Sequence, residues 1–137
     1  MELKELFGKT ITRIYAVFGV EQWWLDTADC FLEIDEQFII GFPFFYNDDV
    51  WVRELTSNAE QLFQSGNPTI VIGRQIADFV WYEDDDYGGY FLLDDGSLIT
   101  ETRMSPQGTG DAGLNFFRNL EELAELRGTD MKMLSKL

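Results

Sequence analysis

Apolar runs separated by turn-forming residues dominate the stretch from Gly73 to Arg103, and this pattern predicts β-structure. We expect one strand in G-R-Q-I-A-D-F-V-W-Y, a turn around Asp84 to Gly89, and a second strand in Y-F-L-L. A tight hairpin at Asp95-Gly96 then leads into a third strand. The first half of the chain repeats the pattern more weakly, with G-K-T-I-T-R-I-Y and C-F-L-E-I-D-E-Q-F-I-I. The chain is therefore predicted to contain two similar strand–strand–hairpin units.

The two units align position by position over their first strands. Gly8 matches Gly73, and Ile11 matches Ile76. We place the internal repeat at residues 8–46 and 73–104, within a single domain spanning residues 1–137. The alternation of apolar and polar residues slips between Ile11 and Ile14, which indicates a β-bulge.

Helical patterns lie outside these units. Met1 to Phe7 predicts a short helix, and the S-x-x-E sequence of Ser57 to Glu60 predicts another that continues to Phe63. Residues Leu114 to Arg127 have the clearest helical spacing, and Asn119 is a second candidate for the residue at which this helix starts. The predicted fold class is α+β, a mostly antiparallel twisted sheet with a C-terminal helix and one or two short helices. The residues expected to be buried are Ile11, Ile34, Phe38, Ile40, Ile76, Phe79, Leu93, Leu98, Phe116, Leu120 and Leu123.

The charge balance narrows the choice of partners. The 137-residue chain has 25 Asp and Glu against 10 Lys and Arg, a formal net charge of −15. Nucleic-acid binding requires clustered basic residues, and anionic membranes repel such a chain, so neither partner is expected. A basic protein is the favoured partner, although the acidity could serve solubility alone. With no apolar leader at the N-terminus and a single cysteine, a cytoplasmic location is expected.

The chain lacks the residues that several kinds of active site and metal site require. The chain has no histidine, and Cys30 is its one cysteine, so Ser-His-Asp sites, Cys-His sites and zinc sites of the usual type are excluded. The glycine-rich segment M-S-P-Q-G-T-G-D-A-G lacks the Gly-Lys-Ser/Thr of a phosphate loop and is interpreted as a turn. We expect no catalytic residue, no metal and no cofactor.

Residues Glu83 to Asp86 form the densest acidic run, flanked by aromatic side chains. The run does not keep the ligand spacing of a calcium loop. Acids beside aromatic rings suit an Arg- and Lys-rich partner through charge-assisted hydrogen bonds and cation–π contacts. The residues predicted to bind a partner are Trp81, Tyr82, Glu83, Asp84, Asp85, Asp86 and Tyr87.

The C-terminal segment P-Q-G-T-G-D-A-G-L-N-F-F, followed by N-L-E-E-L, resembles the ends of small acidic chains of the immunity-protein class. With the general character of the chain, it is similar to immunity proteins of bacterial toxin–immunity systems. The resemblance includes no motif with an assigned functional residue. It implies a non-enzymatic inhibitor that binds a basic protein such as a toxin. A structural or adaptor module and a carboxylate-based hydrolase are the alternatives.

Overall fold

The computed structural model describes residues 1–22, 25–43, 52–53, 59–62, 71–83, 89–101 and 114–137. These residues form two five-stranded antiparallel sheets and an α-helix near the C-terminus, which confirms the predicted α+β class. The first sheet has the order β4-β3-β2-β1-β5, and its strands are β1 (Ile11–Gln22), β2 (Leu25–Ile34), β3 (Phe38–Gly41), β4 (Val52–Arg53) and β5 (Ala59–Leu62). The second has the order β10-β6-β7-β8-β9, and its strands are β6 (Ile76–Trp81), β7 (Tyr90–Leu93), β8 (Leu98–Glu101), β9 (Leu114–Phe117) and β10 (Lys132–Met133).

The two sheets have the same connectivity. In each, four consecutive strands form a meander, and the last strand returns to pair with the outer side of the first. Both first hairpins also have an irregularity at the same place, between Ile11 and Arg13 in β1 and between Ile76 and Asp78 in β6. The expected bulge is therefore present, and the described parts of the two predicted units are alike in strand order.

Reciprocal backbone hydrogen bonds join the two units where their first strands begin. The N–H of Gly8 donates to the carbonyl of Ile76 at 2.8 Å, and that of Gly73 donates to the carbonyl of Ile11 at 2.7 Å. The N–H groups of Ile11 and Ile76 make a second matched pair of bonds, to the carbonyls of Arg74 and Lys9. Thr10 and Gln75 form the bridge between these pairs. The exchange relates the two units by a local two-fold axis.

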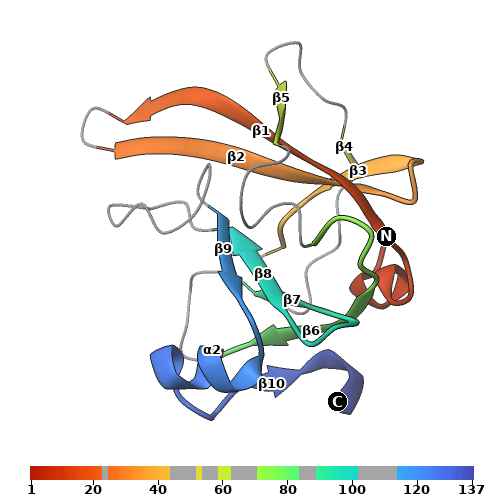
Figure 1. Ribbon diagram of the computed structural model, residues 1–137, viewed down its shortest axis with the longest axis vertical. Coiled ribbons are helices and arrows are strands. Elements are labelled where there is room, and N and C mark those ends of the chain that lie inside the picture. The colour runs from red at the N-terminus through yellow and green to blue at the C-terminus, as the bar shows by residue number, and fades with distance from the viewer. Residues whose placement is uncertain (23–24, 44–51, 54–58, 63–70, 84–88, 102–113) are drawn as a thin grey trace.

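The side chains of a strand alternate between the two faces of its sheet, and apolar side chains lie on both faces of the second sheet. The second sheet is therefore the middle one of three layers. The main core lies between the sheets and includes Ile14 and Leu32 from the first and Phe79 and Phe91 from the second. A second cluster lies on the other face of the second sheet, under the helix α2 (Leu120–Arg127). Figure 1 shows the first sheet above, the second sheet below it, and α2 with β10 at the bottom.

The residues predicted to form the core lie inside. Phe38, Phe116 and Leu120 are partly buried and pack against the two clusters. The fully buried members are Ile11, Ile34, Ile40, Ile76, Phe79, Leu93, Leu98 and Leu123. The strand register inferred from the sequence is therefore correct for these positions.

Two helix predictions are wrong because strand pairing overrides the local pattern. Ala59–Leu62, expected to be helical, is β5 and pairs with β1 from Ile14 to Val17. Leu114–Phe117 is β9, paired with β8, and the helix begins only after the N-cap Asn119. At the N-terminus, the expected helix is one 3₁₀ turn, η1 (Leu3–Leu6).

Candidate functional site

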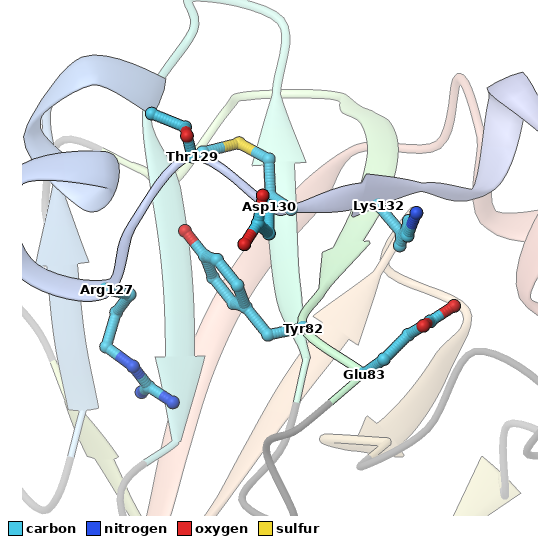
Figure 2. A pocket seen from close by; sticks show the side chains of 7 residues that line it. Tyr82, Glu83, Arg127, Thr129, Asp130 and Lys132 are labelled. Atoms are coloured by element: carbon cyan, nitrogen blue, oxygen red, sulfur yellow. The ribbon is translucent and has the colours of Figure 1, made fainter.

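A pocket opens where β6 ends and the loop from α2 to β10 passes over it. Its volume is about 570 Å³, within the range of ligand pockets in proteins. Figure 2 shows Tyr82 in the middle of this space, with Arg127 on one side and Glu83 and Lys132 on the other. Among the described residues, those that line the pocket are Tyr82, Glu83, Arg127, Thr129, Asp130, Met131 and Lys132.

Tyr82 fixes the loop that forms one wall. Its hydroxyl donates a 2.8 Å hydrogen bond to the carbonyl of Gly128, the residue that ends α2. Gly128 has a φ of 101°, a conformation that favours glycine, and its N–H donates to the carbonyl of Ala124. The chain therefore leaves the helix in a defined direction, across the end of β6.

Arg127 is held against two tyrosines. Its guanidinium lies 5.6 Å from the centre of the Tyr82 ring, a cation–π distance, and donates a 2.8 Å hydrogen bond to the hydroxyl of Tyr90. Tyr82 and Tyr90 meet edge to face at 6.4 Å. These contacts fix the guanidinium on the sheet side of the pocket.

The rim carries exposed charges of both signs. Glu83 lies two residues after the end of β6, Asp130 lies in the loop from α2 to β10, and Lys132 begins β10. The pairing of Lys132 with Trp81 across the β10–β6 ladder sets the position of Lys132. Met131 packs against the second core cluster and supplies an apolar part of a lining that is otherwise mostly polar. Such a site can receive a ligand that has an apolar stem and a charged end.

The structure describes three residues of the predicted partner-binding segment. Trp81 is only 6% exposed and stacks on Phe79 at 6.2 Å, and Tyr82 is only 8% exposed. Their rings present little area to a partner, because both faces of the second sheet are covered. Glu83 is exposed on the pocket rim. The predicted residues Asp84, Asp85, Asp86 and Tyr87 lie outside the described residues.

The acid Asp78 holds the C-terminus rather than a ligand. Its side chain is buried and accepts hydrogen bonds from the N–H of Phe79 at 2.8 Å and from the N–H of Ser135 at 3.0 Å. The hydroxyl of Ser135 donates to its second oxygen. Asp78 thereby fixes the 3₁₀ turn η3 (Leu134–Lys136) against β6.

Glu33, on the outer face of the first sheet, is likewise engaged. Its Oε1 accepts from Arg13 at 2.6 Å and from the hydroxyl of Thr12 at 2.8 Å. The ion pair with Glu33 raises the pKa of Arg13. Burial and the negative charge of Glu33 raise the pKa of Tyr15. Across the described ranges, no group of three or more acids or cysteines is arranged to hold a metal ion.

Comparisons of the chain with protein families, with curated proteins and with solved structures found no match. In the part of the chain that the structure describes, no helix is both long and apolar enough to cross a bilayer. The function is therefore inferred from the chemistry of the chain's own residues.

Proposed function

We propose that this protein is a non-enzymatic acidic binding protein that inhibits a basic protein, in the manner of a bacterial immunity protein, in the cytoplasm. The observation that carries the proposal is the net charge of −15, together with the exposure of many of its acids. The exposed acids of the described residues are Glu2, Glu5, Glu36, Glu83, Asp94, Asp95, Glu121, Glu125 and Asp130.

An excess of surface charge of one sign favours association with a partner of the opposite sign. Like charges on one small domain repel each other, and a basic partner relieves that repulsion. The field of the domain also steers such a partner toward the surface and raises the association rate. The charge thus supports a fast-binding inhibitor of a basic protein.

The roles of the shielded acids support binding rather than hydrolysis. A carboxylate-based hydrolase needs two acids that face a substrate across a cleft, one of them shielded from water so that it stays protonated. Asp78 instead binds η3, and Glu33 binds Arg13 and Thr12 on the surface of the sheet. Both carboxylates stabilise the fold through these bonds.

The test is affinity capture from the native host, with the bound proteins identified by mass spectrometry. A basic protein should be retained at low salt and released as salt rises, because exposed charges are screened over about 8 Å at physiological ionic strength. The purified partner should lose its activity when the acidic protein is added. Capture of a neutral or acidic assembly whose binding is insensitive to salt would contradict the proposal and favour an adaptor module.

A further inference from the structure

We propose that the pocket between β6 and the α2–β10 loop binds an arginine side chain of the partner, with its guanidinium between Glu83 and Asp130. This inference rests on the proposed function, because it assigns the partner's chemistry at one place on the acidic surface. The first support is the position of the two carboxylates, which line the same pocket from different segments of the chain.

The two carboxylates are available for a cation. Both Glu83 and Asp130 are exposed, and neither forms an ion pair or hydrogen bond with another described residue. A guanidinium has five donors in a planar fork that matches carboxylates in bidentate geometry. Arginine is also less strongly hydrated than lysine, which favours it where a charge is partly removed from water.

The inner lining suits the stem of the side chain. Met131 is half-buried, packs against the second core cluster and lines the pocket, whereas Tyr82 adds only a small exposed area. The three methylenes of arginine can lie along this apolar surface while the charged end remains at the rim. The thioether of methionine is flexible and polarisable, so it can adapt to such a stem.

Two cationic side chains of the protein itself, Arg127 and Lys132, also line the pocket and affect how strongly it binds an arginine. Arg127 is held by Tyr82 and Tyr90, so its guanidinium is directed to the sheet. Lys132 lines the pocket on the same side of Tyr82 as Glu83, as Figure 2 shows, and is exposed. Lys132 therefore competes with an incoming arginine for the carboxylates, and its removal should strengthen binding.

The probe is a capped Gly-Arg-Gly peptide, titrated into the ¹⁵N-labelled protein and followed by NMR. Amide shifts should be concentrated at the pocket, and the matching citrulline peptide, which lacks the charge, should cause much smaller changes. Glu83→Gln and Asp130→Asn should each weaken binding about threefold, as expected for solvent-exposed ion pairs, and Lys132→Gln should strengthen it by a similar factor. Glu36→Gln is the matched control, since it removes one exposed negative charge in the β2–β3 turn of the other sheet.

The outcomes separate this inference from the proposed function. Equal binding of the citrulline peptide, or equal weakening by Glu36→Gln and Glu83→Gln, would overturn the arginine pocket. Capture of the basic partner with unchanged affinity by the double variant Glu83→Gln/Asp130→Asn would also overturn the arginine pocket. The proposed function would stand in that case. Pocket-specific binding of the arginine peptide by a protein that captures no basic partner would support the pocket and contradict the proposed function. Thermal melts of the variants should match that of the parent, because the substituted side chains are exposed.

Discussion

Replacing Gly89 with alanine should strongly destabilise the protein. A Cβ atom at this position would lie 1.8 Å from Cζ of Phe79 and 2.5 Å from both of its Cε atoms. Carbon atoms in contact normally stay about 3.5–4 Å apart, so the new methyl group would occupy the same space as the ring. Either the Phe79 ring or the backbone at Gly89 would have to move.

Neither group can move without loss of other contacts. Phe79 is 0% exposed, packs edge to face on Phe91 at 5.7 Å and stacks on Trp81. The Gly89 carbonyl accepts a 2.7 Å hydrogen bond from the hydroxyl of Thr100, which fixes the backbone. Overpacking a well-packed core costs about 1–3 kcal/mol, and we expect Gly89→Ala to reach at least the upper end, about 3 kcal/mol.

The free energy of unfolding should be measured by chemical denaturation, with Gly73→Ala as the control. Gly73 has a φ of +90° but nothing within 4 Å of the position of a Cβ, so alanine there should cost only about 1 kcal/mol from backbone strain. A double variant Gly89→Ala/Phe79→Leu should show favourable coupling of about 1 kcal/mol or more, because leucine removes the clashing ring atoms. The reasoning fails if Gly89→Ala costs no more than Gly73→Ala, or if Phe79→Leu brings no relief.

Three further outcomes are expected. Asp78→Ala should cost about 1–3 kcal/mol in chemical denaturation and speed amide exchange at Ser135, whose N–H loses its acceptor. In an NMR titration, Tyr15 should ionise above its ordinary pKa of 10.0, and Glu33→Gln should lower the Tyr15 pKa. Because the folded-state pKa of Tyr15 is raised, its contribution to stability is present below pH 10.0 and is lost as the pH rises through the folded-state value. Asn119→Ala should cost about 1 kcal/mol in thermal or chemical denaturation, since it removes the N-cap of α2, whereas Asn119→Asp should retain the stability.

Strand positions could be predicted because their apolar residues are both periodic and buried. Gly8 and Gly73 match in the sequence, and in the structure both have positive φ and exchange equivalent hydrogen bonds. The hairpin expected at Asp95-Gly96 is present, with the N–H of Gly96 donating to the carbonyl of Leu93. Local chemistry and long-range pairing agree at these positions, so the pattern alone is sufficient.

The pocket could not be predicted, because its parts are distant in the sequence. Tyr82 and Arg127 meet because α2 packs on the second sheet, and the position of Lys132 depends on β10, which has just two residues in a tail without a clear pattern. The acids that closely follow Trp81 in the sequence predict a surface position for it, whereas it is buried. Its burial depends on the core formed by both sheets, which is a property of the whole fold.

The outer faces of the two sheets differ in how far they are covered. The pair Tyr15 and Phe31 in the first sheet corresponds to Val80 and Tyr90 in the second, at equivalent places after the shared bulge. Val80 and Tyr90 are buried with Leu123 of α2, whereas Tyr15 and Phe31 are only partly buried.

The adjacent pair of aligned positions shows the same difference between the two outer faces. Arg13 and Glu33 form an ion pair on the outer face of the first sheet, while the equivalent positions of the second hold Asp78 and Leu92. Asp78 binds the C-terminal turn, and Leu92 packs in the cluster under α2. The same strand order therefore supports a partly exposed polar surface in one unit and a covered apolar surface in the other. The pocket is formed by the covering segment, α2 with its loop to β10, so the likeness of the two sheets does not imply a second copy of the site.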